Sequence, residues 1–600
     1  MKISTSFIKF SSLIATAAFV LFGINNVVAN GNAVAGNLYV TNPANCVNTT
    51  TWNGTAWNNG MPQINTRVIL AGNYTSTTNI IACNLTVTNG AQVIITEGTT
   101  LTVENEITVT NGSTLTINSN ANLVQINDAA VNNGIITVKR NSSALYRLDY
   151  TLWSSPVSGQ QLQAFSPATS ANRFYEYKST GAAAGQYLTV NAATTNFDAA
   201  KAYLIRMPNA DTSTPGYNEG TASLTFTGTF TGTANNGIIT KDLTTDSDRY
   251  TAVGNPYASA INLNDFFEAN SGVLDPGAAL YFWRKKTDSN ASSYASLTRD
   301  AYVYNHSKGG ADDTEEFGGA QWDELFNGTS SENWVINPGQ GFIVRTAAGV
   351  TNPQLVFNNA MRRGDTHNNQ FFRTAQQEDP KSRMWLNLTG NDAFSQTAIV
   401  YSNTATAGID YGRDGKQITS GMVSFYSIAQ QTNLTIQARP AFQDNDVVTM
   451  GYVANATGTF TINLHRKDGV FVNGQNIFIK DKLLSIVHNL TNSDYTFTTE
   501  AGTFDTRFEI VYSSAALGTD APVLTSNEVI VYKQDGAINI SAGTTEITDV
   551  TVYDISGRRL YSKSNVNATK TVVSNLQAAQ EVLIVELNTA KGKVSKKILF

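Results

Sequence analysis

The densest group of carboxylates in the sequence lies in one segment, GGADDTEEFGGAQWDELF, at residues 309–326. Its acidic residues are Asp312, Asp313, Glu315, Glu316, Asp323 and Glu324. Calcium takes six to eight oxygen ligands from a flexible loop, so the first four are candidate calcium ligands. Two carboxyl groups roughly 5–9 Å apart across a bound sugar would instead support glycoside hydrolysis. Because the Asp-x-Asp-x-Asp-Gly spacing of calcium loops is missing, a solvated acidic loop is the favoured interpretation, and no resident cofactor is predicted.

Histidine chemistry has little support in this chain. The four histidines are His306, His367, His465 and His488, and none has a partner at the spacing of a metal site. Gly-x-Ser-x-Gly, His-Glu-x-x-His and phosphate-binding Gly-rich motifs are missing. We therefore predict loop or surface histidines, assign no catalytic residue, and expect that the protein is not an enzyme, although a histidine-dependent hydrolase stays open as the alternative.

Cysteine chemistry is confined to Cys46 and Cys83. In an oxidising compartment these two are expected to pair, and free buried thiols are the alternative. A loop of this length would contribute about 3–4 kcal/mol in the chain-entropy model. No histidine lies close enough in sequence to build a metal cluster with them.

The N-terminal sequence predicts export to such an oxidising compartment. Lys2 and Lys9 precede the apolar stretch SSLIATAAFVLFGI, and Val27-Val28-Ala29 resembles a cleavage site. Residues 1–29 therefore indicate a secretory signal peptide, with an uncleaved anchor helix as the alternative. No later apolar run reaches membrane-spanning length, so we expect no transmembrane segment in the mature chain.

The amino-acid composition further restricts the class of protein. Charged residues make up 14% of the chain, the net charge is −6 and hydrophobic residues make up 41%. This balance argues against nucleic acid as a partner, since phosphate binding needs a basic surface. At 600 residues the chain is too long for one core, and Thr, Asn, Ser and Gly replace charge on its surface, as in extracellular β-proteins.

The elements that position these residues are expected to be strands. Leu85-Thr-Val-Thr-Asn-Gly90 recurs as Ile107-Thr-Val-Thr-Asn-Gly112, and shorter strand-turn units lie within that period. This pattern predicts a short β-solenoid over residues 30–140, with a β-sandwich of similar hairpins as the alternative.

The remaining chain is expected to be all-β in several domains. A central β domain with long loops is predicted at 141–375, a β-sandwich at 382–514, a linker at 515–526 and a last β domain at 527–600. Within these, residues 223–233 read as a half-buried strand, and 278–286 and 340–348 as buried strands. Asn264 is expected to cap a short helix at 264–270, and Asp468-Gly469 and Asn473-Gly474 to form hairpin turns.

The closing segment, EVLIVELNTAKGKVSKKILF at 581–600, predicts a strand with two unlike faces. Val594, Lys596, Ile598 and Phe600 share one face, whereas Lys591, Lys593, Ser595 and Lys597 share the other. Edge lysines protect a sheet against aggregation. A terminal strand of this kind can also be offered to another protein as an address.

Upstream, VTVYDISGRRLYSKS at 550–564 places two strands on either side of the turn Asp554-Ile555-Ser556-Gly557-Arg558. Together with Lys593, Lys596 and Lys597, this turn resembles the C-terminal sorting domain of type IX secretion substrates in Bacteroidota. Residues 494–513, before the linker, are similar to the lead-in of the variant called sorting signal type C. Gly254-Asn255-Pro256-Tyr257 and 337–345 resemble surface proteins of the same bacteria.

The resemblance implies a small Ig-like β-sandwich with a sorting signal at Asp554, Gly557, Arg558, Lys593, Lys596 and Lys597. Its implied partners are the outer-membrane translocon and a sortase-like peptidase, and its implied route leads through the periplasm to the cell surface or the medium. We therefore expect an adhesin or binding scaffold. A glycan-binding or glycan-degrading protein that uses loops of the central domain, on surface or environmental polysaccharides, is the alternative. Trp52, Trp57, Trp322 and Trp334 are candidate aromatics for stacking on sugar, although for each of them the favoured interpretation is that it seals a domain core or corner.

Overall fold

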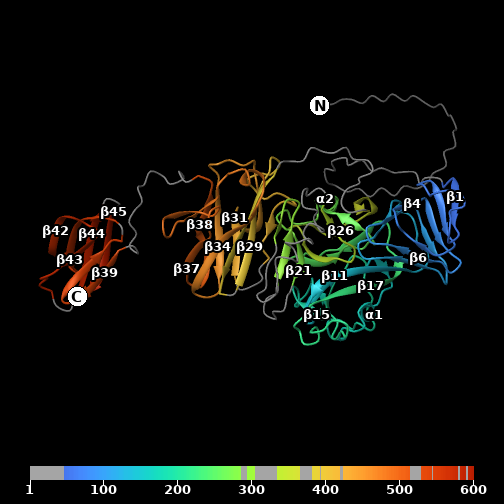
Figure 1. The fold of residues 1–600 in the computed structure, drawn as a ribbon, viewed down its shortest axis with the longest axis horizontal. Coiled ribbons are helices and arrows are strands. Elements are labelled where there is room, and N and C mark those ends of the chain that lie inside the picture. Colours follow the sequence, from blue (N-terminus) through green and yellow to red (C-terminus); the bar gives the residue numbers. More distant parts are fainter. Residues whose placement is uncertain are drawn as a thin grey trace, which may run out of the picture. The chain divides into compact units, whose positions relative to one another are not determined.

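The computed structural model describes residues 46–600, apart from 247, 285–292, 304–333, 365–380, 392, 419–422, 514–528, 544, 579–580 and 590–591. These residues form an almost entirely β-sheet protein, as the sequence predicts (Figure 1). The described helices are α1 (Leu162–Phe165), α2 (Leu263–Ala269) and the 3-10 turns η2 (Asn359–Met361) and η3 (Gly469–Phe471). None of the described helices is both long enough and apolar enough to cross a bilayer.

Several predicted segments lie outside the described residues. They are the signal peptide at 1–29, the acidic segment 309–326 with its candidate calcium ligands Asp312, Asp313, Glu315 and Glu316, and the linker at 515–526.

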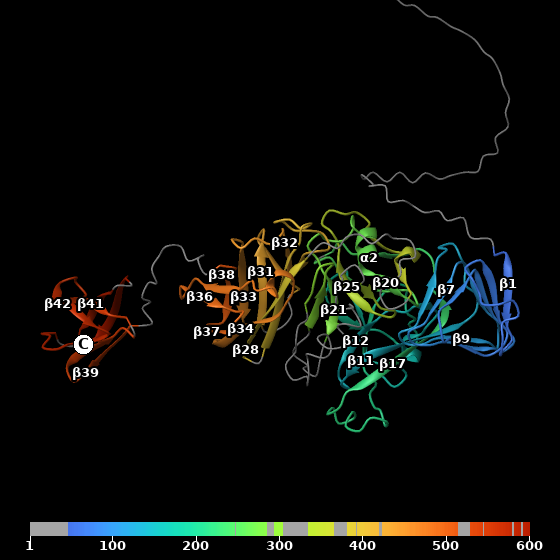
Figure 2. The same cartoon turned by 45° about the horizontal axis from the view of Figure 1, so that its top comes forward.

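A β-solenoid opens the described chain. Its strands are β1 (Asn48–Trp52), β2 (Thr66–Leu70), β3 (Tyr74–Thr75), β4 (Ile80–Ala82), β5 (Asn84–Val87), β6 (Gln92–Ile95), β7 (Thr100–Val103), β8 (Ile107–Val109), β9 (Thr114–Ile117), β10 (Asn122–Gln125) and β11 (Ile136–Leu145). They stack in parallel as three sheets, ordered β1-β2-β5-β8, β3-β6-β9-β11 and β4-β7-β10 (Figure 2). Each of the three complete coils, β2-β3-β4, β5-β6-β7 and β8-β9-β10, therefore supplies one strand to each sheet.

The sequence repeat is the coil period. Leu85 pairs with Ile107 and Val87 with Val109, so the recurring segments lie directly on top of one another. Their inward side chains are buried in one core. Asn89 and Gly90 follow β5 with φ of +57° and +72°, a backbone conformation that glycine and asparagine tolerate best. This confirms the prediction of a short solenoid.

The solenoid passes into the next block inside a strand. β11 pairs in parallel with β9 on one side and antiparallel with β17 (Leu224–Ala234) on the other. The predicted boundary at residue 140 therefore falls within β11, and one core cluster runs from Val68 to Ala258. At this downstream end of the solenoid, the other two sheets also form backbone hydrogen bonds to later segments of the chain. Leu123 N donates to Ala258 O at 2.8 Å, and Val109 N donates to Asn133 O at 2.9 Å.

A buried arginine strengthens this junction. Arg362 is 4% exposed, and its guanidinium donates to Leu123 O at 2.6 Å and to Ser259 Oγ at 3.2 Å. It also lies over the Tyr257 ring at 4.7 Å. Burial lowers the pKa of Arg362 to about 10, which still leaves it charged at neutral pH. The Gly254–Tyr257 segment thus forms part of the contact between solenoid and central block.

The central block (residues 150–363) holds several small sheets, including β19-β25-β21-β22-β23. Its further strands are β12 (Tyr150–Trp153), β13 (Val157–Ser158), β14 (Phe174–Tyr177), β15 (Tyr187–Thr189), β16 (Tyr203–Arg206), β18 (Ile239–Asp242), β19 (Tyr250–Gly254), β20 (Ala260–Asn262), β21 (Leu280–Arg284), β22 (Ser293–Leu297), β23 (Tyr302–Val303), β24 (Val335–Ile336), β25 (Gly341–Arg345), β26 (Gln354–Phe357) and β27 (Arg362–Arg363). The half-buried strand predicted at 223–233 is β17, and the buried strands are β21 and β25.

The predicted helix cap is wrong by two residues. The N-cap of α2 is Asn262, whose side chain accepts a hydrogen bond from Asp265 N at 3.0 Å. Asn262 ends strand β20 with extended backbone angles, so Asn264 already lies inside the helix.

The third block (residues 382–512) is built from one long mixed sheet. Its strands are β28 (Ser382–Gly390), β29 (Ala393–Tyr401), β30 (Gly415–Lys416), β31 (Val423–Ala429), β32 (Thr432–Arg439), β33 (Val447–Ala454), β34 (Gly458–Lys467), β35 (Phe478–Asp481), β36 (Ile486–Asn489), β37 (Tyr495–Thr499) and β38 (Gly502–Val511). The order is β36-β35-β38-β33-β31-β32-β29-β28-β34-β37. Strands near opposite ends of this order share one core. The ring centroids of Phe497 on β37 and Phe508 on β38, for example, lie 4.9 Å apart.

The hairpin predicted between the strands now seen as β34 and β35 is wrong. β34 pairs with β28 and β37, whereas β35 pairs with β36 and β38. The Gly469 and Gly474 positive-φ positions bend the chain from one part of the sheet to another, and Gly469 opens the 3-10 turn η3.

The last block forms a two-sheet antiparallel sandwich, called here the C-terminal sandwich (residues 529–600). Its strands are β39 (Ile530–Gln534), β40 (Ala537–Ser541), β41 (Ile547–Asp554), β42 (Arg559–Ala568), β43 (Lys570–Val573), β44 (Val582–Thr589) and β45 (Gly592–Leu599). The sheets are ordered β39-β40-β43 and β42-β41-β44-β45. Every residue of its core cluster comes from within this block.

Candidate functional site

The Asp554–Arg558 turn joins β41 to β42 and is fixed by one carboxylate. Asp554 Oδ1 accepts hydrogen bonds from Ser556 N and Arg558 N, both at 2.9 Å, and Oδ2 accepts from Arg558 Nε at 2.9 Å. These bonds, the backbone bond from Arg558 first, lower the pKa of Asp554. Gly557 has φ of +81°, which an L side chain would strain. The turn therefore presents Ile555 and Arg558 in fixed positions.

The lysines of the predicted sorting signal lie on β45, at one end of the four-stranded sheet order. Val594 and Phe600 are buried, and Lys593, Ser595 and Lys597 are exposed, which confirms the expected alternation for these residues. Lys596 is half-buried, and Lys593 pairs with Glu586 at 2.6 Å. Lys591 lies outside the described residues.

Charge sets this block apart from the rest of the chain. Residues 527–600 contain nine Lys and Arg against seven Asp and Glu, whereas the whole chain has a net charge of −6. The turn and β45 thus belong to a mildly cationic module in an acidic protein, and its cations can attract an acidic partner surface.

The two cysteines form a disulfide that closes the start of the solenoid. Cys46 and Cys83 have Cα atoms 5.6 Å apart and are separated by 37 residues. Cys83 is fully buried between β4 and β5. The bond fixes the segment before β1 to the first full coil.

Replacing both Cys46 and Cys83 with serine is expected to reduce the unfolding free energy of the solenoid by about 3–4 kcal/mol, because the unfolded loop regains its freedom. Urea denaturation followed by tryptophan fluorescence measures this change. Reductant should give the same loss in the native chain and no further loss in the double variant. Equal denaturation midpoints for the native and double-serine chains would contradict the prediction.

The candidate tryptophans differ in their exposure to solvent. Trp52 and Trp57 are half-buried at the first coil, with ring centroids 5.4 Å apart, and both contact Tyr74. Trp334 is 3% exposed and belongs to the core of the central block, so it is not a surface for sugar. Trp322 lies outside the described residues.

The two histidines that the structure describes lie on different strands. His465 is exposed on β34, and His488 on β36 has its Nε2 2.8 Å from Ser493 O. His306 and His367 lie outside the described residues. Across the part of the chain that the structure describes, no group of His, Cys, Asp and Glu is arranged to hold a metal ion.

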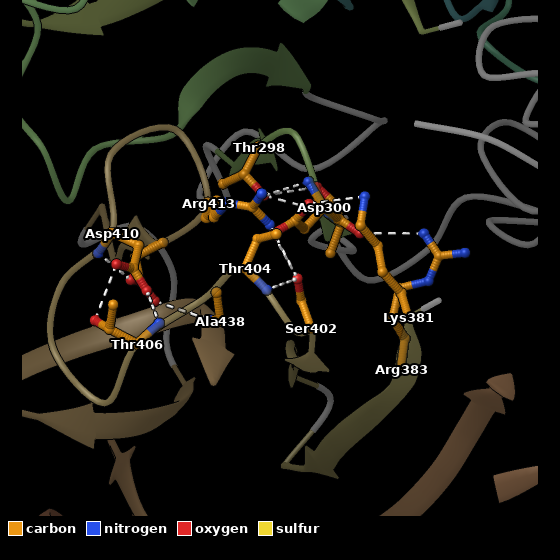
Figure 3. Close-up of polar contacts among 12 residues, drawn as sticks. Thr298, Asp300, Lys381, Arg383, Ser402, Thr404, Thr406, Asp410, Arg413 and Ala438 are labelled. Carbon is orange, nitrogen blue, oxygen red and sulfur yellow. Dashed lines mark hydrogen bonds and ion pairs between the residues drawn. The ribbon is translucent and has the colours of Figure 1, made fainter. Parts of the chain in front are cut away.

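A cluster that the sequence did not reveal joins the central and third blocks (Figure 3). Asp300 follows β22 and is 1% exposed. Its Oδ1 lies 3.0 Å from Lys381 Nζ, and its Oδ2 lies 2.8 Å from Arg413 Nη1. Arg383 Nη1 donates to Asp300 O at 3.1 Å. One buried carboxylate thus holds a cation that directly precedes β28 and a second cation, Arg413, from a distant segment of the third block.

Arg413 belongs to a docking loop, residues 402–418, which leads from β29 through β30. Tyr411 Oη donates to Phe267 O at 2.7 Å, and Lys416 Nζ lies 2.9 Å from Asp275 Oδ1. Burial alone would raise the pKa of Asp275, but hydrogen bonds from Lys416 and Gly277 N outweigh it, and the pKa lies below its usual value. The docking loop is therefore fixed to the central block by these side chains and also by backbone hydrogen bonds, such as that from Lys416 N to Gly277 O at 2.6 Å.

Asp414 lies inside the docking loop with no exposed surface. Its Oδ2 accepts from Asp410 N at 2.6 Å and its Oδ1 from Ala438 N at 2.8 Å. Burial raises the pKa of Asp414 to about 7 against these two bonds, and the charges of Asp410 and Asp300 add to the rise. Asp414 therefore changes its protonation state close to neutral pH.

The chemistry of this cluster suits a structural clamp that holds the central and third blocks together. Both carboxylate oxygens of Asp410 accept hydrogen bonds from Thr406: Oδ1 from Thr406 Oγ1 at 2.9 Å and Oδ2 from Thr406 N at 2.6 Å. Asp300 and Asp414 likewise have an internal donor on each carboxylate oxygen. A substrate would have to displace these donors. The sequence signal for the loop is the long polar connection between Tyr401 and Val423, because connections of that length usually have a role.

Comparisons with known proteins assign the two parts of the chain separately. No curated protein matches the chain. Residues 517–600 match a family model described as a domain of unknown function, DUF8694. Residues 45–512 match a second family model, also described as a domain of unknown function, DUF8693. Since that second match covers well over half of the sequence, the chain belongs to the DUF8693 family.

Proposed function

We propose that this chain is a type IX secretion substrate whose C-terminal sandwich is the export signal and whose preceding blocks form a surface scaffold. The observation that carries the proposal is the separate core of the C-terminal sandwich, whose described residues and packed neighbours all come from within 529–600, whereas another cluster combines Ala301 of the central block with Trp385 of the third. A module with its own core can be recognised, and removed, without unfolding its cargo.

The electrostatics of the module support the same proposal. Its outer β45 face exposes Lys593 and Lys597, and Arg558 has a side chain that is 75% exposed. Cations on a small module in an acidic protein give a receptor a surface that differs in sign from the cargo.

For the cargo we propose adhesion or matrix binding and no catalysis. The supporting feature is the pair of junction contacts between successive blocks, made by Arg362 at one junction and by Asp300 at the other. The proposed ligands are surface or environmental polysaccharides. The half-buried Trp52 and Trp57 pair in the first coil supports this choice, since aromatic rings stack on sugars.

Deleting residues 527–600 is expected to leave the chain in the periplasm and to abolish its display on the cell surface. Fractionation of cells that carry this secretion system, with surface protease accessibility of the solenoid, measures the result. The matched control is a full-length chain with Lys570 replaced by alanine, an exposed cation on β43 in the other sheet of the same sandwich. Normal display of the deletion variant would refute the proposal.

A further inference from the structure

One end of the four-stranded sheet in the C-terminal sandwich exposes a row of aliphatic side chains. Val582 on β44 and Leu599 on β45 pair directly and are 39% and 70% exposed. The pairing of β41 with β44 ends at Asp554 and Leu583, next to Val582, and Ile555 follows Asp554 as the first residue of the turn and is 72% exposed. We call Ile555, Val582 and Leu599 the end row. Contiguous exposed aliphatics of this kind mark interaction surfaces.

The end row is held rigidly. Ile555 sits in the turn that Asp554 fixes through Ser556 N and Arg558 N, and Val582 and Leu599 are in paired strands. A partner that covers these side chains therefore has little chain entropy to overcome in this part of the sandwich.

Cations surround the end row. Arg558 follows in the same turn, Arg559 pairs with Tyr553 next to the turn, and Lys597 lies two residues before Leu599 on the same outward face. Glu581 precedes Val582, while the Asp554 carboxylate is already engaged by Arg558. Since Arg558 and Asp554 offset each other, Arg559 and Lys597 against Glu581 leave the rim with a net positive charge, and its complement is an apolar surface bordered by carboxylates.

Resting on the proposed function, we propose that the end row is the face by which the C-terminal sandwich docks on the export machinery. The partner is a protein surface with an apolar centre and acidic rim. The outward face of the three-stranded sheet, with Ile530, Tyr532 and Val572, has similar exposure and serves as the control surface in the test below.

The test uses the full-length chain with Ile555→Asp and Leu599→Asp together. Because both side chains are exposed, the melting temperature is expected to stay unchanged, and surface display is expected to fall about tenfold or more as carboxylates meet an acidic rim. The matched control is Ile530→Asp with Val572→Asp, at residues 60% and 50% exposed, and display should persist.

A second variant keeps the apolar row and reverses its rim: Lys597→Glu with Arg559→Glu. It is expected to lower display several-fold even where the first variant folds poorly. If deletion of residues 527–600 blocks display but both end-row and rim variants are displayed normally, the docking face is wrong and the proposed function stands. If the deletion variant is displayed, the proposed function itself fails. If the control pair loses display as well, the end row is not the specific face.

Discussion

Replacing Asp300 with alanine is expected to lower the unfolding free energy of the joined central and third blocks by about 3 kcal/mol. The substitution removes the carboxylate that Lys381 and Arg413 share and leaves two partly buried cations without their counter-ion. Breaking a buried pair by removing one partner is costly because the remaining charge keeps its desolvation penalty. The drop should appear as a lower melting temperature and as faster proteolysis of the docking loop.

The matched control for Asp300 lies on the same side of the contact. Glu268 is 58% exposed and lies 3.9 Å from Arg299, so Glu268→Ala should change stability by less than about 1 kcal/mol. If Asp300→Ala were as mild as Glu268→Ala, the cluster would not be a clamp. Asp300→Asn should fall between the two, because it keeps the volume and one acceptor but loses the charge.

Stability is expected to fall as the pH rises from about 4 to 7, and Asp414 is the cause. Burial raises the pKa of Asp414 from 3.8 to about 7, so within this window the folded chain binds a proton that the unfolded chain has released. The contribution is therefore fully present below the unfolded pKa and is lost as the pH passes the folded pKa, a change of about 4 kcal/mol in total. Carboxyls with lowered pKa, such as Asp275, act in the opposite sense but only below about pH 4.

Melting temperatures measured between pH 4.5 and 8 test this effect of Asp414. Asp414→Asn should flatten the profile, although it lowers stability at every pH because the amide nitrogen cannot accept from Asp410 N or Ala438 N. The slope is therefore the informative quantity. Asp444→Asn, in an exposed loop, should leave the slope intact. A native profile that is flat across this window would rule out a raised Asp414 pKa.

The parts of the fold that could be predicted are those in which sequence period and structural period coincide. Leu85 and Ile107 occupy the same place in consecutive coils, so their spacing in sequence is also their register in the sheet. The alternation of Val594, Lys596 and Phe600 with exposed lysines follows from strand geometry alone. The Cys46–Cys83 contact follows from the scarcity of other thiols.

The parts that could not be predicted depend on distant segments. Asp300, Lys381 and Arg413 are far apart in sequence, and each looks like an ordinary surface charge until the blocks meet. The choice between Asn262 and Asn264 as a helix cap was set by where β20 ends, which local preference cannot reveal. Likewise, β34 and β35 follow each other closely but pair with different strands, because the long sheet curls around its own core.

The downstream end of the solenoid has a consequence for self-association. A stack of parallel coils normally ends in bare backbone groups that can recruit an identical coil from another molecule and seed fibrous growth. In this protein, β17, Asn133 and Ala258 each take the next position on one of the three sheets. At this end of the solenoid the edge of every sheet is thus already hydrogen-bonded within the same chain. Neighbouring molecules at high local density therefore cannot add a coil there.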